Sequence, residues 1–239
     1  MNPIILIPAR MASTRLPDKP LALIGALPMI VHVLRRAEEA GIGRVVVACD
    51  GEAIATAVTN AGGEAVITDP GLPSGSDRIY QALQKIDAQK KYDIIINMQG
   101  DMPTLDPAVI VKLLELMKDG QVDIATLAAP IRDESELTDP AVVKPVIAFK
   151  EEGKTGRALD FNRENVSGNA YHHIGLYGYT RVALEKFVAL PPSENEKSRK
   201  LEQMRALDNG MRIDITIVDT VPLGVDTPET LEKARRALR

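Results

Sequence analysis

The chain has 239 residues, of which 45% are hydrophobic, 26% are charged and 3% are aromatic, and its formal net charge is -4. This composition is typical of a folded globular protein and excludes a disordered chain, while the acidic balance argues against a broad nucleic-acid surface. A single cysteine excludes an internal disulfide, and no apolar stretch of the sequence is long enough to span a membrane. We therefore expect a cytoplasmic protein that does not bind nucleic acid and does not insert into a membrane.

Short β-branched runs alternate with amphipathic stretches in the first half, which is typical of parallel strands joined by helices. Residues 4–7 are apolar at consecutive positions, which favours a strand covered on both faces. The predicted strands are 4–7, 44–48, 64–68 and 92–98, and the predicted helices are 28–40, 52–60, 77–87 and 107–118. The first half therefore predicts four βα units.

The alternation of strands and helices ends after a predicted strand at 123–127. Strands at 143–149, 158–161 and 172–179 follow one another without long helices between them, which indicates an antiparallel segment. Helices at 183–189, 197–207 and 228–238 and a strand at 212–219 complete the prediction. We expect an α/β fold with a mainly parallel sheet, flanking helices and an antiparallel segment in the second half, all in a single domain spanning 1–239.

The loop after the first predicted strand is rich in cations and hydroxyls. It carries Arg10, Ser13, Thr14, Arg15 and Lys19. Open α/β sheets bind ligands at the carboxyl ends of their strands, and Arg and Lys are well suited to phosphate oxygens. The loop thus predicts a site for a polyanion, with a solvated polar loop as the alternative. The sequence lacks the glycine patterns of P-loop and NAD-binding proteins, which argues against both classes.

Two carboxylates stand out as candidate metal ligands. Asp101 follows the strand 92–98, where it either binds Mg2+ or is a turn residue beside Gly and Pro. Asp226 is more ambiguous, because Asp226 or Thr227 is expected to cap the last helix, with Glu229 completing a capping box from Asp226. Arg78 lies in the first turn of a predicted helix, where it either meets a ligand or belongs to a plain N-cap turn.

The histidines and the cysteine lack the spacing of a zinc site. His172 and His173 are consecutive on a predicted strand and must point to opposite faces, so at most one of them serves a given pocket. We expect His32 to be an ordinary surface or packing residue. Cys49 ends an apolar run and is expected to be a small buried side chain.

Six segments occur in a characteristic order along the chain. They are IPARMASTRLPDKPL (7–21), SGSDR (74–78), NMQGD (97–101), HIGLY (173–177), LEQMRAL (201–207) and GVDTPE (224–229). Together they closely resemble the 3-deoxy-manno-octulosonate cytidylyltransferase family. The resemblance implies a fold like that of nucleotide-diphospho-sugar transferases. It also implies Mg2+-dependent transfer of CMP from CTP to 3-deoxy-manno-octulosonate (Kdo), giving CMP-Kdo and pyrophosphate for lipopolysaccharide biosynthesis.

Carried over by position, the resemblance also implies roles for individual residues. Those expected to hold the triphosphate are Arg10, Arg15 and Lys19, and those lining the nucleotide site are Ser13, Arg78 and Gln99. The expected Mg2+ ligands are Asp101 and Asp226. Those expected to face the sugar acid are Arg163, His173, Tyr177, Glu202 and Gln203. The family is further expected to form a cytoplasmic homodimer, with 140–205 as a sugar-binding and dimerisation subregion.

The chain departs from the family pattern at a few positions. Family members usually have His at the position of Leu72, an acidic residue or Leu at Met102, and Ile-Pro or Ala-Pro at 166–167. Two alternatives to Kdo activation stay open. One is a cytidylyltransferase for another acidic sugar, such as 8-amino-Kdo or sialic acid, and the other is a noncatalytic nucleotide-binding sensor. We expect replacement of Arg10 or Lys19 to lower turnover and to leave stability almost unchanged.

Overall fold

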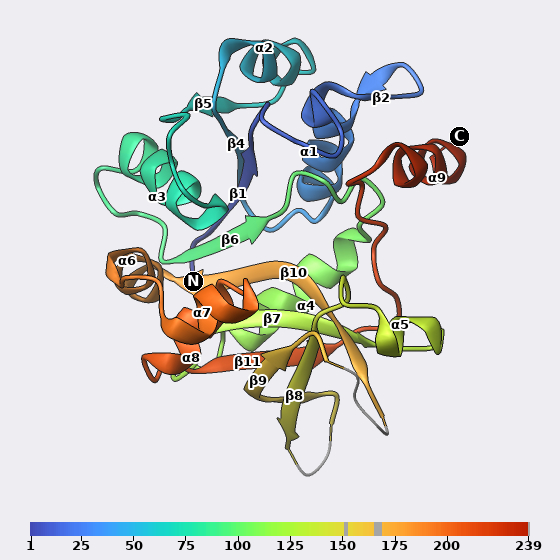
Figure 1. Ribbon diagram of the computed structural model, residues 1–239. Helices are drawn as coiled ribbons and strands as arrows, with labels where there is room; N and C mark the ends of the chain where they lie inside the picture. Colours follow the sequence, from blue (N-terminus) through green and yellow to red (C-terminus); the bar gives the residue numbers. More distant parts are fainter. Residues whose placement is uncertain (151–152, 165–168, 239) are drawn as a thin grey trace. The chain divides into compact units, whose positions relative to one another are not determined.

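The computed structural model describes residues 1–150, 153–164 and 169–238 (Figure 1). They divide into two compact units, the first formed by Met1–Val111 with Pro222–Arg239 and the second by Lys112–Val221. The expected subregion 140–205 falls inside the second unit, and its roles, like the single domain, stay predictions. Among the described residues, no helix has the length and apolar character needed to cross a membrane.

The first unit is built on four parallel strands, which are β1 (Pro3–Ala9), β4 (Arg44–Cys49), β5 (Ala65–Ile67) and β6 (Ile94–Met98). Their order is β5, β4, β1, β6. The apolar run at 4–7 is fully buried, because helices cover both faces of β1. The predicted parallel sheet is confirmed, with strand ends shifted by one or two residues.

Each of these strands is followed by a helix, as the four predicted βα units require. The helices are α1 (Met29–Glu39), α2 (Glu52–Asn60), α3 (Gly75–Ile86) and α4 (Pro107–Leu116). The chain moves outward from β1 to β4 and β5, and then returns to the other side of β1 to form β6. Right-handed crossovers therefore place α1 and α2 on one face and α3 on the other (Figure 1). The reversal creates a topological switch point between β1 and β6.

A small apolar cluster joins the loop after β1 to the C-terminal helix α9 (Pro228–Ala237). Its buried members are Leu16, Ile24, Met29, Val225, Leu231 and Ala234. The sequence analysis missed the short helix η1 (Lys19–Leu21) and the hairpin of β2 (Leu23–Ile24) and β3 (Leu27–Pro28), and Ile24 of this hairpin belongs to the cluster. Packing of this cluster brings the segment before α9 beside the loop after β1.

The second unit contains a mixed five-stranded sheet. Its strands are β7 (Ile124–Pro130), β8 (Lys144–Phe149), β9 (Thr155–Asn162), β10 (Tyr171–Thr180) and β11 (Ile213–Ile217), in the order β10, β7, β11, β9, β8. Only β7 and β11 pair in parallel, and the other three pairs are antiparallel. The predicted antiparallel segment is confirmed.

The helices of this unit correct one prediction. They are α5 (Ser135–Thr138), α6 (Arg181–Ala189), α7 (Glu194–Arg199) and α8 (Gln203–Asp208). The predicted single helix at 197–207 is wrong, because Lys200 adopts a left-handed conformation with a φ of 55° and ends α7. The next residue, Leu201, is buried, so burying its side chain favours the break. The carboxylate of Glu196 then accepts two hydrogen bonds from Arg205, which joins α7 to α8.

Candidate active site

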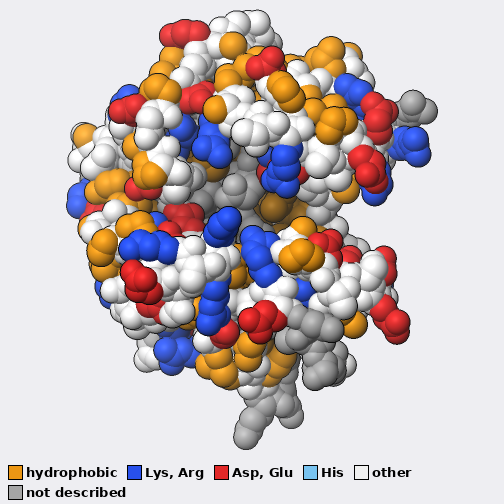
Figure 2. Space-filling view, viewed as in Figure 1, with side chains coloured by type: hydrophobic (Ala, Val, Ile, Leu, Met, Phe, Trp, Pro, Cys, Tyr) orange, Lys and Arg blue, Asp and Glu red, His pale blue; other side chains and the backbone are white. Residues whose placement is uncertain are grey.

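A pocket of about 630 Å³ opens in the first unit beside the β1–β6 switch point. Parallel sheets bind ligands at such points, where neighbouring loops diverge. The pocket is lined by the loop after β1, the start of α3, the loop after β6 and one residue before α9, and its charged or polar side chains are Arg10, Ser13, Thr14, Arg15, Lys19, Ser74, Arg78, Gln99, Asp101 and Asp226. On the face of this unit seen in Figure 2, Lys and Arg side chains stand beside a hollow in the surface. The structure thus gathers every predicted phosphate, nucleotide and metal residue in one pocket.

The ammonium of Lys19 lies between the two candidate metal ligands. Its Nζ donates to Asp101 Oδ2 at 2.8 Å and to Asp226 Oδ1 at 2.9 Å. Arg15 makes a further ion pair with Asp226 Oδ2 at 3.0 Å. Burial lowers the pKa of Lys19, but the two carboxylates outweigh it and the net direction is upward. Within the described part of the chain, no cluster of three or more His, Cys, Asp or Glu side chains is arranged to hold a metal ion.

Close backbone packing places Asp101 in this pocket. A Cβ on the preceding residue, Gly100, would lie 2.8 Å from the carbonyl oxygen of Pro8, so only glycine lets the loop after β6 approach the end of β1 this closely. The carbonyl of Asp101 in turn accepts a hydrogen bond from the amide of Val225 at 2.9 Å. The same hydrogen bond places Asp226, which follows Val225, in the pocket.

The structure decides the role of the segment before α9. Thr227 is the N-cap, since its Oγ1 accepts from the amide of Thr230 at 3.2 Å, and these two threonines form the capping box. The predicted box between Asp226 and Glu229 is therefore wrong, and the Thr227 alternative is confirmed. Because the helix is capped by its neighbour, the Asp226 carboxylate is free to contact Lys19 and Arg15.

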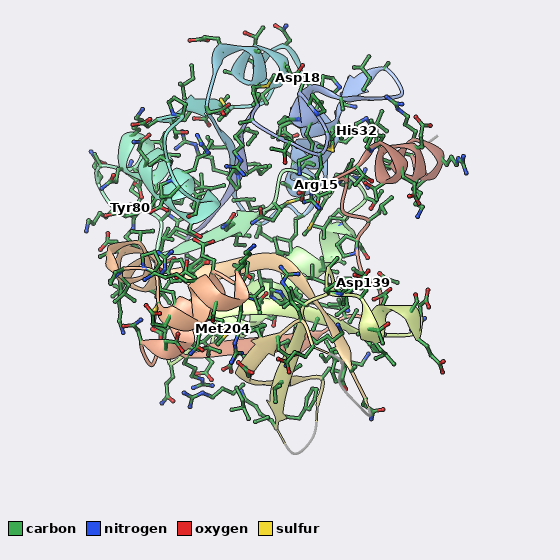
Figure 3. The ribbon with its side chains drawn as sticks, viewed as in Figure 1. Arg15, Asp18, His32, Tyr80, Asp139 and Met204 are labelled. Atoms are coloured by element: carbon green, nitrogen blue, oxygen red, sulfur yellow. The ribbon has the colours of Figure 1, made fainter. Side chains whose placement is uncertain are left out.

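The cationic loop is held by a carboxylate that sequence reasoning missed. The amide of Met11 donates to both oxygens of Asp50, at 3.1 Å each. Asp50 directly follows β4, and this position at the end of a strand was the signal that could have found it. Arg10 is exposed, and Arg15, labelled in Figure 3, lies on the same loop with 66% of its side chain exposed. Both guanidinium groups are thus accessible to a ligand.

Of the two alternatives for Arg78, the structure confirms the N-cap turn, and contact with a ligand stays a prediction. Ser74 caps α3 by accepting from the amide of Asp77 at 3.2 Å, so the plain N-cap turn is present. Arg78 also lines the pocket, yet it is buried and its Nη1 donates to Thr68 Oγ1 at 2.6 Å and to the carbonyl of Asp69 at 3.2 Å. Burial lowers the pKa of Arg78. Part of this guanidinium is therefore committed to holding the pocket wall.

The predicted sugar-facing residues lie in the second unit. His173 is buried, and its ring contacts Phe161 at a centroid distance of 5.0 Å and Tyr177 at 5.5 Å. Burial raises the pKa of Tyr177 well above its usual value, and the charge of Glu202 adds to this effect. Gln203 is buried too, and its Nε2 has no hydrogen-bond partner within the described ranges. These side chains form a polar and aromatic group whose ligand role stays a prediction.

Arg163, the remaining sugar-facing candidate, holds a turn. Its Nη1 donates to the carbonyls of Pro140 and Ala141 at 2.8 and 3.0 Å. The other two carbonyls of the turn, those of Asp139 (labelled in Figure 3) and Val142, each accept from Nζ of Lys144 at 3.1 Å. Lys144 is fully buried, and a lysine inside an apolar strand was the signal that sequence reasoning passed over.

His172 points away from His173 and pairs with Glu136 at 2.8 Å. His32 packs in the first unit and bonds the carbonyl of Ile24, and Cys49 is fully buried, as expected. Leu72 lines the pocket. The departures at 166–167 lie outside the described residues.

Comparison with known proteins agrees with this geometry. A family model described as Cytidylyltransferase matches residues 4–213. The chain is 59% identical to a 3-deoxy-manno-octulosonate cytidylyltransferase of Parvibaculum lavamentivorans, over 99% of this chain and 93% of the relative. It is 54% identical to one of Paramagnetospirillum magneticum, over 100% and 98% of the two chains.

Solved structures give the same picture. The structure of a CMP:2-keto-3-deoxy-manno-octonic acid synthetase complexed with CTP matches with a TM-score of 0.92 and 36% identity, covering 100% of this chain and 98% of the other. A UDP-glucose pyrophosphorylase without ligand matches with a TM-score of 0.72 at 16% identity, over 100% and 98%, and this likeness concerns the fold alone. The expected fold class is therefore confirmed.

Proposed function

The chain belongs to the 3-deoxy-manno-octulosonate cytidylyltransferase family of nucleotidyltransferases, and from this membership we propose that it transfers CMP from CTP to Kdo, producing CMP-Kdo and pyrophosphate for lipopolysaccharide biosynthesis. The observation that carries the proposal is the pocket at the switch point, where Arg10, Arg15 and Lys19 gather beside two carboxylates. A polyanionic nucleotide and a metal ion both find complementary groups there.

The proposed reaction is a substitution at phosphorus. The anomeric hydroxyl oxygen of Kdo attacks the α-phosphorus of CTP and forms a new P–O bond. The bond from the α-phosphorus to the bridging oxygen breaks, and pyrophosphate leaves with that electron pair. The hydroxyl proton passes to solvent, so the chemistry requires no protein general base.

Charge is the main obstacle, because an anionic sugar must approach a polyanionic triphosphate. Arg10 and Arg15 are exposed on the pocket loop and can clamp phosphate oxygens with paired hydrogen bonds, while Lys19 adds a compact charge. Ser13 and Gln99 offer neutral polar contacts on the same wall. Orientation of the two reactants is worth about 7 to 11 kcal/mol in well-oriented intramolecular reactions, and preorganised charges add an electrostatic contribution.

The residues present fit a magnesium ion. Asp101 and Asp226 already hold one cation, the Lys19 ammonium, between their carboxylate oxygens. Hard carboxylate oxygens are the ligands that Mg2+ prefers, with substrate phosphates and water completing its shell. When bound, Mg2+ supplies positive charge at the phosphates. Asp101 and Asp226 would hold it, and the Lys19 ammonium would turn from the carboxylates to the triphosphate.

The sugar acid is proposed to contact the second unit. Arg163 keeps donors beyond the one nitrogen that holds the turn, and Gln203 has a buried Nε2 without a partner among the described residues. Together with His173, Tyr177 and Glu202, they supply hydrogen-bonding groups of both polarities for carboxylate and hydroxyls. We also propose a homodimer, with 140–205 contributing to its interface, and a cytoplasmic location.

Release of pyrophosphate tests this function directly. Turnover is expected only when CTP, Mg2+ and Kdo are all present, with UTP and ATP much poorer. Parallel assays with 8-amino-Kdo and sialic acid separate the nearest alternatives, and turnover with sialic acid but not Kdo would overturn the substrate while retaining the reaction. A chain that binds CTP but turns over none of these sugars would be the noncatalytic sensor. Retention of both carboxylates beside the cationic loop argues against that outcome.

A further inference from the structure

Thr126, in the middle of β7, contacts three polar atoms of β10. Its Oγ1 lies 2.9 Å from the carbonyl oxygen of Leu176, 3.2 Å from that of Ile174 and 3.0 Å from Nε2 of His173. The pairing of β10 with β7 shifts its register between Ile174 and Tyr177, which allows both carbonyls to reach one hydroxyl. Thr126 is fully buried, so water does not satisfy these groups.

Few hydrogens are available for hydrogen bonds around the hydroxyl oxygen of Thr126. A threonine hydroxyl carries one hydrogen and two acceptor sites, whereas carbonyl oxygens only accept. If the hydroxyl donated to His173 Nε2, the carbonyls at 2.9 and 3.2 Å would face its lone pairs without a hydrogen between them. If it donates to a carbonyl instead, Nε2 of His173 must carry the hydrogen that bridges to Oγ1.

We infer that Thr126 is a positioning residue that fixes His173 as the Nε2–H tautomer, leaving Nδ1 as a hydrogen-bond acceptor for a donor group of the substrate. In the described residues, no hydrogen bond to Nδ1 of His173 is present. Burial, with the nearby His172 adding to it, lowers the pKa of His173 to about 3, so the ring stays neutral near pH 7. Because its Nε2–H is engaged by Thr126, the neutral ring offers a ligand only the acceptor Nδ1.

This inference rests on the proposed function where it concerns the substrate. A sugar hydroxyl can donate to Nδ1, whereas a carboxylate oxygen would meet the nitrogen lone pair and be repelled. The group recognised by His173 is therefore a hydroxyl of the sugar acid, and the carboxylate belongs with cationic or amide donors elsewhere.

The tautomer is measured without any substrate. Long-range 1H–15N NMR correlations of the 15N-labelled ligand-free protein distinguish the two ring nitrogens, and the chain has only three histidines. The expected spectrum shows His173 with a protonated Nε2 and a bare Nδ1, in the wild type and in Thr126→Ser. In Thr126→Val the ring should redistribute between tautomers. A protonated Nδ1 in the wild type, or an unchanged tautomer in Thr126→Val, would overturn the inference.

Steady-state kinetics then test the substrate contact. Loss of one neutral hydrogen bond is expected to raise the KM for Kdo about 3- to 10-fold in Thr126→Val, while the KM for CTP stays unchanged and Thr126→Ser restores it. Thr216→Val is the matched control, because it removes a nearly buried threonine hydroxyl from the adjacent strand β11. An unchanged KM for Kdo would refute the donor contact. Because the NMR result needs no turnover, it stands apart from any failure of the proposed function.

Discussion

Lys19 should behave as the resident cation of the acid pair Asp101 and Asp226, and Lys19→Met tests this. The substitution keeps most of the side-chain volume and removes the charge. The side chains of Lys19 and Asp101 are 18% and 24% exposed, so solvent screens their ion pair little. The side chain of Asp226 is 41% exposed, so solvent weakens its ion pair with Lys19. A charge-assisted hydrogen bond contributes about 1.5 to 3 kcal/mol and an exposed pair less than about 1 kcal/mol, so we expect a loss of about 2 kcal/mol.

For a chain of this length, that loss lowers the melting temperature by about 4 to 8 °C. This replaces the expectation from sequence that Lys19 contributes little to stability. Added Mg2+ should reverse the loss, since the two carboxylates no longer have a competing ammonium. At a free concentration about 30 times its Kd, a bound ion contributes about 2 kcal/mol.

The assay is thermal unfolding of the wild type, Lys19→Met and Arg10→Ala, with EDTA or with excess Mg2+. Arg10 is exposed and serves as the control, so Arg10→Ala should melt like the wild type. Both variants should lose about 10- to 100-fold in turnover efficiency, as expected for a lost phosphate contact. If Lys19→Met melts like the wild type, or if Mg2+ stabilises the two equally, the ammonium does not occupy the cation site.

Four further outcomes are expected. Asp226→Asn should keep a near-native melting temperature, because Thr227 caps α9, yet lose at least about 100-fold in pyrophosphate release, and full activity would remove it from the site. The pKa of His173 is near 6.5 in the unfolded chain and about 3 in the folded protein. Its contribution to the free energy of unfolding is therefore complete above pH 6.5 and falls as the pH drops toward 3. At pH 5 the free energy of unfolding measured with urea should be lower by about 2 kcal/mol, and His173→Asn should remove this part of its pH dependence. Gly156→Ala should cost about 1 to 3 kcal/mol or more, because its Cβ would lie 2.5 Å from a carbonyl oxygen, whereas Gly120→Ala, with open space around it, should unfold like the wild type. Leu72→His should fold normally and change the KM for CTP or Kdo by a small factor, while a large loss of stability would contradict its place on the pocket wall.

Local patterns in the sequence were sufficient for the βα units and the cationic loop. The apolar run at 4–7 and the amphipathic helix at 52–60 are recognisable because burial imposes a period on side chains that lie near one another in the chain. Asp101 could be predicted for a related reason, since it directly follows a buried strand and the ends of parallel strands lie at one edge of a sheet.

Contacts between distant segments could not be predicted in this way. Asp226 and Lys19 are separated by 207 positions, and they meet because the apolar cluster packs α9 against the loop after β1. Sequence pattern alone could not choose between Asp226 and Thr227 as the cap, because both side chains carry a suitable acceptor. The break at Lys200 depends likewise on burial of Leu201 and on the bond from Arg205 back to α7.

The sequence by itself therefore determined the fold class, the order of the four βα units and the chemical character of the loop after β1, because these follow from periodicity and from residue type. Only the tertiary structure decided which side chains share a site and in which state they are held. The Lys19 ammonium lies between two carboxylates because the apolar cluster packs α9 against the loop after β1, whereas the hydroxyl of Thr126 meets His173 through the pairing of β7 with β10. The register of a strand is fixed where its apolar face is buried against partners far away in the chain, so a short stretch of sequence does not say which side chains will meet.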